Sequence, residues 1–341
     1  MIAERVHHAR AYHGWSQEHL AKLIGKSQPA ISQIEKGAPA ADETIAAIAE
    51  QTQFGPEFFL RGPLPDLPMG SLRFRKRASS TKRDDERIRA HVRQTLEVLE
   101  GLWPRAPKLP VRLEPVPADA VVDVDFIESL AVNVREYLGV GPHDPIPNLT
   151  RAVERAGVVV IGSSQEIGTH EGASYWPGNP IGRPIICLSR EKPGDRNRLS
   201  LGHEFGHLLL HQLRQIDSGA SEQEAYRFAG ALLIPREVLH DQIEGPVTLH
   251  DLALVKSRFG IAVSALVRRC LDLGLISPER RTSLEKQISA RGWRKEEPVH
   301  VPTEHPELVR ELLISAMGTD NPIRLHRTLA LPPLAIRDMV A

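Results

Sequence analysis

The residues most suited to chemistry form the stretch His203-Glu-Phe-Gly-His207. In a helix, two histidines four residues apart project from one face and can bind one zinc ion. The glutamate between them then lies beside a water molecule that it can deprotonate. Neighbouring leucines and Phe205 make the segment apolar nearly all round, which predicts a buried helix. Two buried imidazoles without partners would be costly, and zinc would satisfy both. The alternative is a pair of hydrogen-bonded core histidines without metal.

A zinc hydrolase needs a third protein ligand and one open coordination position. The next predicted helix, around residues 221–235, offers Glu222 and Glu224. At about 100° per residue, Glu222 falls near the apolar stripe of this helix and Glu224 falls toward its polar side. Ser221 and Glu224 also fit a capping box, which gives Glu224 a structural alternative. We therefore assign Glu222 as the third ligand.

Length and composition limit what the rest of the chain can be. The 341 residues suffice for about two domains. Lysine and arginine number 43 and aspartate and glutamate 43, which excludes a generally basic nucleic-acid coat and leaves only a local patch for DNA. Two cysteines exclude a disulfide scaffold and fit a reducing compartment. No apolar run approaches the roughly 18 residues of a membrane helix, and the first residues lack a signal peptide's apolar stretch. We expect a cytoplasmic protein without membrane contact.

Residues 1–60 have the pattern of short, sharply ended helices. Ser16 and Ser27 can cap helices that start at the next residue, and Gly25 lies where a left-handed residue would end the first of them. The stretch Trp15–Gly37 resembles the Xre-type helix-turn-helix domain of phage repressors almost position by position. The resemblance implies five helices, with the third in the major groove of a double-stranded DNA operator. It also implies five contact residues: Gln28, Ser32 and Gln33 at base edges, and Gln17 and Lys36 near phosphates.

The charge of this first module leaves a second interpretation open. Residues 1–60 hold five basic and seven acidic residues, whereas non-specific DNA affinity depends on neutralised phosphates. A helical protein-docking role is therefore the alternative. The basic run at residues 73–83 either adds phosphate contacts or is a solvated linker. Because single helix-turn-helix modules usually read paired half-sites, we expect a homodimer.

The middle of the chain changes from helical to strand-like patterns and back. Residues 123–138 and 145–156 predict amphipathic helices, and three strand-like runs follow, at residues 158–161, 173–176 and 184–188. The last two are separated by a loop composition that suits a hairpin. Ser174, Tyr175 and Trp176 could form an edge for an extended peptide substrate, with ordinary sheet packing as the alternative. From residue 195 to about 290 the pattern is helical, and the tail after residue 292 has no assignment.

A second resemblance joins these segments. The stretch Leu201–His211, followed by Glu222–Pro235, resembles the ImmA/IrrE family of zinc metallo-endopeptidases, and the strands before it look like that family's. The resemblance implies a gluzincin-like fold with zinc on His203, His207 and Glu222 and with Glu204 as general base. Better-known members cleave a partner repressor and so switch genes on.

One position departs from that family. Four residues after the glutamate ligand the family usually has Asp or Asn, which would orient a zinc-binding histidine, and this chain has Tyr226. Loss of such a partner typically costs on the order of 10–100-fold in metal affinity or activity. We expect Tyr226 and Glu224 to lie next to the metal ligands and to support them without binding the metal themselves. His211, one turn beyond His207, either belongs to this layer or is a polar helix end.

Two further features have structural alternatives. The segments 249–259 and 263–274 resemble a second helix-turn-helix, although they suit a structural bundle equally well. Cys187 lies in an apolar strand and is expected in the core.

The combined prediction is an α+β, mostly helical protein with a five-helix repressor-like domain and a gluzincin-like zinc domain with a small sheet. The expected divisions are residues 1–62 for DNA binding, 63–122 for a linker and helix, 123–292 for the peptidase domain and 293–341 for the unassigned tail. The predicted function is a DNA-binding regulator that cleaves a repressor or antitoxin with Zn²⁺. The alternative is a regulator whose zinc domain senses a ligand or docks a partner without cutting, and a metal-free scaffold is a third interpretation.

Overall fold

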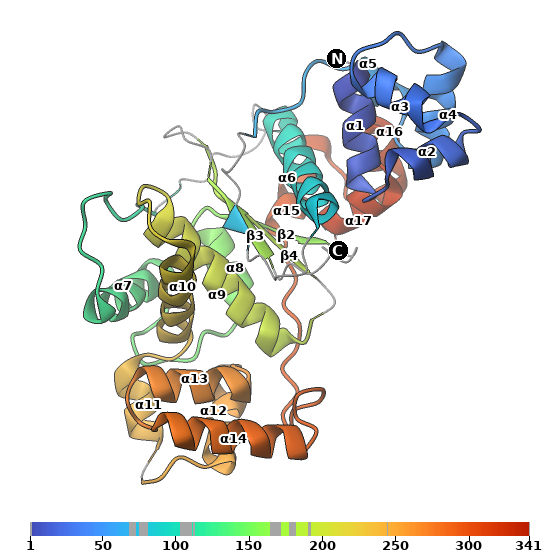
Figure 1. The fold of residues 1–341 in the computed structure, drawn as a ribbon. Coiled ribbons are helices and arrows are strands. Elements are labelled where there is room, and N and C mark those ends of the chain that lie inside the picture. Colours follow the sequence, from blue (N-terminus) through green and yellow to red (C-terminus); the bar gives the residue numbers. More distant parts are fainter. Residues whose placement is uncertain are drawn as a thin grey trace. The chain divides into compact units, whose positions relative to one another are not determined.

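The computed structural model describes most of the chain, and its elements are labelled in Figure 1. The described residues are 2–67, 73–74, 81–102, 111, 113–163, 172–176, 182–189, 192–243 and 245–340. The chain divides into two compact units. The first comprises Met1–Leu109, Ile161–Ala173 and Pro306–Ala341, and the second comprises Pro110–Val160 and Ser174–His305. Within the described ranges, no helix has both the length and the apolarity that crossing a membrane requires.

Five short helices open the first unit, as the sequence predicts. They are α1 (Ile2–Tyr12), α2 (Gln17–Leu23), α3 (Gln28–Glu35), α4 (Asp42–Thr52) and α5 (Pro56–Leu60). Ser16 caps α2 by accepting a hydrogen bond from the His19 amide at 3.0 Å, and Ser27 caps α3 in the same way. Gly25 has a φ of 64°, the left-handed conformation that ends α2. Both predicted caps and the predicted turn are confirmed.

Four more helices complete this unit. They are α6 (Lys82–Leu102), which packs against α1, and α15 (Leu308–Met317), α16 (Pro322–Leu329) and α17 (Pro333–Val340). The Gly55 amide donates to the Ala330 carbonyl at 3.0 Å, and Arg61 donates to the Leu329 carbonyl at 2.6 Å. A side chain at Gly55 would place its Cβ only 2.8 Å from the Cβ of Ala330. From residue 308 onward, the tail that the sequence left unassigned is thus helical, and its hydrogen bonds close it on α5.

The basic run at 73–83 lies largely outside the described residues. Within it, Arg73–Phe74 forms a short strand, β1. Lys82 and Arg83 are exposed in the first turn of α6. The helix expected within residues 63–122 is α6 (Lys82–Leu102).

Two buried histidines of the first unit, His8 and His91, are expected to make its stability sensitive to acid. Burial lowers the pKa of His8 and of His91 from 6.5 to about 3 in each case. Below pH 6.5 the unfolded chain therefore binds protons that the folded chain does not. The stability that these groups contribute is present above pH 6.5 and is lost as the pH falls toward 3. In that window, each histidine is expected to lower the free energy of unfolding by about 1.4 kcal/mol per pH unit.

Hydrogen exchange of the α1 amides at pH 7, 6 and 5 measures this loss in the first unit alone. His91→Phe removes one titrating group while keeping a flat ring beside Tyr12, on which the His91 ring stacks at 4.1 Å. This variant should lose stability less steeply in acid than the native chain. An equal slope for the two proteins would contradict the assignment.

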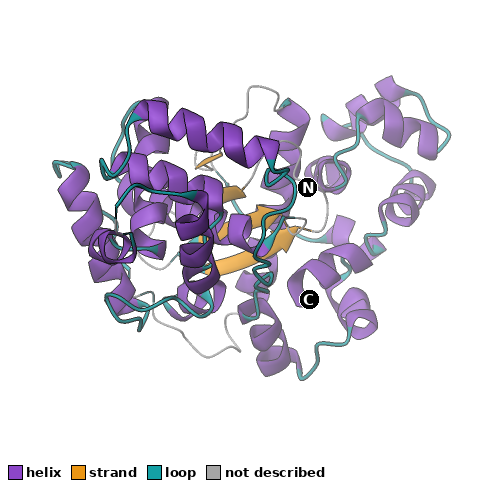
Figure 2. Cartoon of the chain, turned by 90° about the horizontal axis from the view of Figure 1, so that it is seen from below, coloured by secondary structure: helices purple, strands orange, loops and turns teal. Residues whose placement is uncertain are grey.

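The remaining elements are the helices of the second unit and one sheet (Figure 2). The helices are α7 (Val124–Tyr137), α8 (Leu149–Arg155), α9 (Gly194–His211), α10 (Ser218–Leu233), α11 (Arg236–Gln242), α12 (Leu249–Phe259), α13 (Val263–Asp272) and α14 (Pro278–Ala290). The strands β2 (Val159–Ser163), β3 (Gly172–Tyr175) and β4 (Ile185–Ser189) are buried along their whole length. With β1, they form one sheet in the order β1-β3-β4-β2.

The predicted elements of this region are confirmed. β3 and β4 are neighbours, as the hairpin prediction requires, although residues 177–181 between them lie outside the described residues. Cys187 is 1% exposed and belongs to the core, as expected. α9 packs against β4, α8 and α10, so the central helix of the unit carries the His-Glu-x-x-His stretch.

Candidate functional site

Helix α9 presents His203, Glu204 and His207 in the interior of the second unit. Their exposed fractions are 2%, 1% and 4%. The helix is anchored at its start, where Lys256 of α12 donates to both Asp195 and Glu297. This arrangement holds a polar motif in an apolar environment, so the three side chains need partners there.

Two glycines of α9 allow α10 to approach closely. A Cβ at Gly202 would lie 3.2 Å from the Cβ of Ala229, and a Cβ at Gly206 would lie 3.0 Å from the Phe228 ring and 3.3 Å from the Ala225 backbone. Larger residues would push the helices apart. The two glycines therefore set the short distance at which α10 can bring a carboxylate to the histidines.

That carboxylate is Glu222. Its Oε2 lies 3.4 Å from His203 Nε2, its Oε1 lies 3.2 Å from His207 Nε2, and the two Nε2 atoms are 3.0 Å apart. With zinc–ligand distances of about 2.0–2.2 Å, two ligands of a tetrahedral ion lie about 3.3–3.6 Å apart. The three donors thus fit a zinc ion with shifts of a few tenths of an ångström. Among the described residues, they form a candidate metal site.

The neighbouring polar atoms also suit a site that binds a cation and a water molecule. Glu204 Oε2 is buried and has no hydrogen-bond partner within the described ranges. A buried carboxylate oxygen without a hydrogen-bond partner lowers the stability of the fold unless a ligand or a water molecule binds to it. The same holds for His203 Nδ1.

The pKa of Glu222 is shifted by its neighbours. Burial raises the pKa, but the hydrogen bonds and charges of His203 and His207 outweigh burial and hold it well below the usual value. The carboxylate is consequently ionised at neutral pH, which is the form that binds a metal ion.

Glu224 does not face the histidine pair directly. Its Oε2 lies 3.1 Å from His211 Nε2 and accepts from Arg214 Nη1 at 2.8 Å. The capping-box alternative is wrong, because α10 begins at Ser218 and its cap is Asp217, which accepts from the Gly219 amide at 2.8 Å. His211 is the last residue of α9 and is fully buried, so this end of the helix is not solvated.

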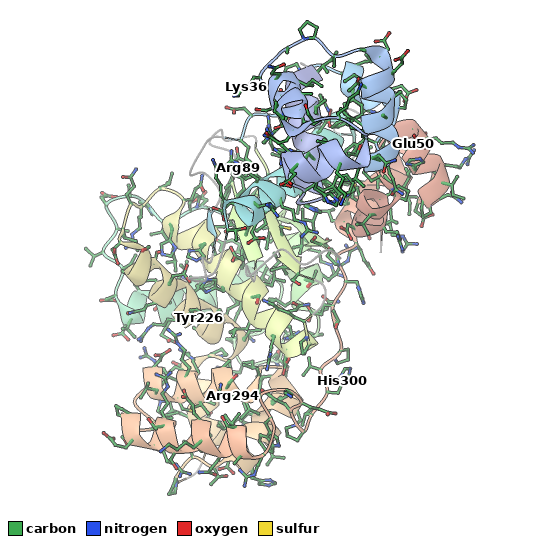
Figure 3. All side chains as sticks on the ribbon, turned by 45° about the vertical axis from the view of Figure 1, so that its right-hand side comes forward. Lys36, Glu50, Arg89, Tyr226, Arg294 and His300 are labelled. Carbon is green, nitrogen blue, oxygen red and sulfur yellow. The ribbon has the colours of Figure 1, made fainter. Side chains whose placement is uncertain are left out.

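Tyr226, which is labelled in Figure 3, packs against the ring of His203. The ring centroids are 4.4 Å apart and the planes are inclined by 55°. On the tyrosine ring lies the guanidinium of Arg268, 4.4 Å from its centroid. Tyr226 therefore lies beside a candidate ligand, as expected from its position in the sequence, and its ring holds His203 by packing.

The structure gives no support for a substrate edge at Ser174 and Tyr175. Their strand, β3, lies between β1 and β4 in the sheet. Both residues are buried, at 1% and 6% exposure. Sheet packing explains both positions, and the argument from a free strand edge does not hold.

The recognition helix α3 is held by apolar contacts and by one ion pair. Ile31 and Ile34 are buried, and Glu35 accepts from Arg10 Nε of α1 at 2.6 Å. Burial raises the pKa of Glu35, but hydrogen bonds from His7, Arg10 and Gln17 lower it to about 2 overall. Glu35 is therefore ionised at any physiological pH.

The five predicted DNA-contact residues lie on or next to this helix. Gln28, Gln33 and Lys36 are exposed, whereas Ser32 and Gln17 are half-buried. Gln28 donates to Gln17 at 2.7 Å, which links the starts of α2 and α3. These exposed polar side chains are available to base edges and phosphates.

The second helix-turn-helix has a structural role instead. Gly260 turns the chain between α12 and α13 with a φ of 66°. Arg269 is buried and donates to both carboxylate oxygens of Glu128 at 2.5 and 2.6 Å. Since Arg268 stacks on Tyr226 and Arg269 is paired in the core, the bundle alternative is favoured over DNA binding.

The chain contains a helix-turn-helix domain and a helix with the His-Glu-x-x-His stretch, and comparison with protein families agrees. Residues 8–59 match a helix-turn-helix family, and residues 153–271 match a peptidase family described as the IrrE N-terminal-like domain. A comparison with curated proteins found no match. The chain is thus a fusion of an Xre-type helix-turn-helix domain and an IrrE/ImmA-like peptidase domain, which confirms both resemblances. The two domains together indicate a DNA-binding regulator that carries a peptidase-like domain.

Proposed function

We propose that this protein is a DNA-binding transcriptional regulator that cleaves a partner protein, a repressor or antitoxin, in the cytoplasm. His203, His207 and Glu222 would hold zinc, and Glu204 would be the general base. The observation that carries the proposal is the convergence of three ligand atoms within 3.0–3.4 Å, next in sequence to a buried carboxylate oxygen that has no partner among the described residues.

The chain's own residues can perform the steps of peptide hydrolysis. A zinc ion in this site supplies a Lewis acid that acidifies water and polarises the scissile carbonyl. Glu204 takes the proton of the attacking water at Oε2 and can deliver it to the leaving amine. Because α9 is buried on nearly all sides, its apolar neighbours exclude other water molecules and strengthen these interactions.

A second candidate function is a regulator whose zinc domain senses a ligand or docks a partner without proteolysis. It is favoured by His203 Nδ1, for which the described structure provides no hydrogen-bond acceptor, and by Tyr226, which replaces the usual Asp or Asn. Such a site would bind metal and turn over slowly. Zinc content together with the fate of a partner protein distinguishes the two functions.

His207→Ala is expected to lower the zinc content from about one ion per chain to nearly none, because two protein ligands rarely hold zinc at a hydrolytic site. Glu222→Ala should reduce zinc affinity far more than Glu224→Ala does. The measurement is metal analysis of the dialysed full-length protein. The matched control is His240→Ala, which removes an exposed histidine of α11. Full occupancy after His207→Ala, or a stronger effect of Glu224→Ala than of Glu222→Ala, would show that the ligand set is wrong.

Gln28→Ala combined with Gln33→Ala is expected to weaken operator binding by about 1–3 kcal/mol per lost base contact, with little change on random DNA. The operator is first selected from a random duplex library, and we expect paired half-sites bound by two copies of the chain. Its affinity should depend only modestly on salt, because the module has few cations. Glu50→Ala, at an exposed residue of α4, is the control (Figure 3). Equal affinity of the native protein for selected and random DNA would favour the protein-docking alternative.

A further inference from the structure

A buried chain of hydrogen-bonding groups leads away from one of the two candidate histidine ligands. His207 Nδ1 lies 2.9 Å from His211 Nδ1, and His211 Nε2 lies 3.1 Å from Glu224 Oε2. Arg214 Nη1 donates to the same carboxylate oxygen at 2.8 Å. His211 is fully buried, and Arg214 is 7% exposed. Two elements, the end of α9 and the start of α10, thus meet through these groups.

When a metal ion takes the Nε2 lone pair of His207, the donors and acceptors of this chain have one consistent direction. The neutral His207 then carries its hydrogen on Nδ1 and donates it to His211 Nδ1, which accepts with its lone pair. His211 carries its own hydrogen on Nε2 and donates it to Glu224 Oε2. Arginine can only donate, so Arg214 and His211 both donate to this carboxylate oxygen. The chain thus favours the tautomer of His207 that binds a cation.

The other histidine ligand is supported differently. His203 Nδ1 has no hydrogen-bond partner within the described part of the chain, and the ring is held by Tyr226 with Arg268 behind it. Packing fixes the plane of a ring but does not choose which nitrogen carries the proton. The two ligands are therefore unequal, and the tautomer of only one is set by the fold.

We propose that His211 is the positioning residue of His207, with its tautomer set by Glu224 and with Glu224 held by Arg214. The inference rests on the proposed zinc site and extends it. Partners of this kind typically contribute 10–100-fold to metal affinity or activity. The relay would thus supply at His207 the orientation that the absent Asp or Asn does not supply at His203.

The first arm of the test measures zinc affinity by competition with a chelator. His211→Leu removes the acceptor and is expected to weaken zinc binding by about 10–100-fold. His211→Asn places an amide oxygen where Nδ1 was, so it should retain affinity within a few-fold of the native protein. His240→Leu is the control for loss of a histidine. Equal losses in the Leu and Asn variants would overturn the proposal, because packing alone would then explain the effect.

The second arm reads the tautomer directly by long-range ¹H–¹⁵N correlation above pH 7 in metal-free, histidine-labelled Glu222→Ala protein. This variant lacks the carboxylate that lies 3.2 Å from His207 Nε2 and would hold a hydrogen there without metal. In it His207 should carry its proton on Nδ1, and adding His211→Leu should shift the proton toward the Nε2–H form that isolated histidines prefer. A proton on Nε2 in Glu222→Ala would refute the relay whether or not the native chain binds zinc. The expected tautomer, together with a native chain that binds no zinc, would support the relay and refute the proposed zinc function.

Discussion

Glu204→Gln is expected to abolish cleavage of the partner protein while zinc content and operator affinity stay unchanged. General-base catalysis contributes about 10²–10⁴-fold, and the glutamine amide cannot accept the proton of the attacking water. The substitution is nearly isosteric, so it leaves His203 and His207 in place. The measurement compares the proteins of cells that carry the native or the variant chain, in which one partner should accumulate uncut with the variant.

The control for this experiment is Glu237→Gln, which makes the same change at an exposed residue of α11. It should leave cleavage intact. If Glu204→Gln changes neither the protein pattern nor gene regulation while zinc is bound, the proteolytic function fails and the non-cutting regulator remains. Loss of zinc from Glu204→Gln would contradict its role as a base, since a base holds no metal.

Removal of residues 306–341 is expected to unfold the helix-turn-helix unit while the peptidase unit stays folded. The removed helices contribute core residues such as Leu313 and Leu325, both fully buried, and they cover α5 and α6. Returning even two apolar side chains to water costs about 3–6 kcal/mol, against a typical domain stability of 5–15 kcal/mol. Operator binding should be lost, and amide hydrogens of α1–α5 should exchange rapidly while those of α9 and α10 remain protected.

A matched pair on α16 tests the same idea without truncation. Leu325→Ala should destabilise the first unit by about 2–5 kcal/mol, because the side chain is fully buried. Ile323→Ala, two residues away and 66% exposed, should have almost no effect. Protection of α1–α5 that survives the truncation would show that the helix-turn-helix folds without its last helices.

The sequence predicted the elements whose signals are local. Caps at Ser16 and Ser27, the turn at Gly25 and the apolar stripe of α10 each depend on a few adjacent residues, and the structure contains all of them. The placement of Glu222 near the histidines followed from the same periodicity. Its role as a ligand stays a prediction.

The parts that sequence missed depend on contacts between distant segments. Arg214 follows the end of α9, where helical periodicity gives no direction, and its role depends on the place of Glu224. The charge of Arg268 is evident from the sequence, but nothing in the sequence indicates that its guanidinium lies on the ring of Tyr226. The helices α15–α17 are only 8–10 residues long, and two of them begin with proline, so no long periodic pattern marked them in the sequence.

The return of the last helices to α5 also affects the order in which a newly made chain can fold. Arg61 bonds to a carbonyl 268 positions later, so its partner leaves the ribosome long after it. At about 5–20 residues per second, this delay is roughly 13–54 s. The peptidase unit, which ends at His305, can be complete while the DNA-binding unit still lacks three helices. A ribosome that stops early would therefore release a folded peptidase unit without a finished DNA-binding unit, and never the reverse.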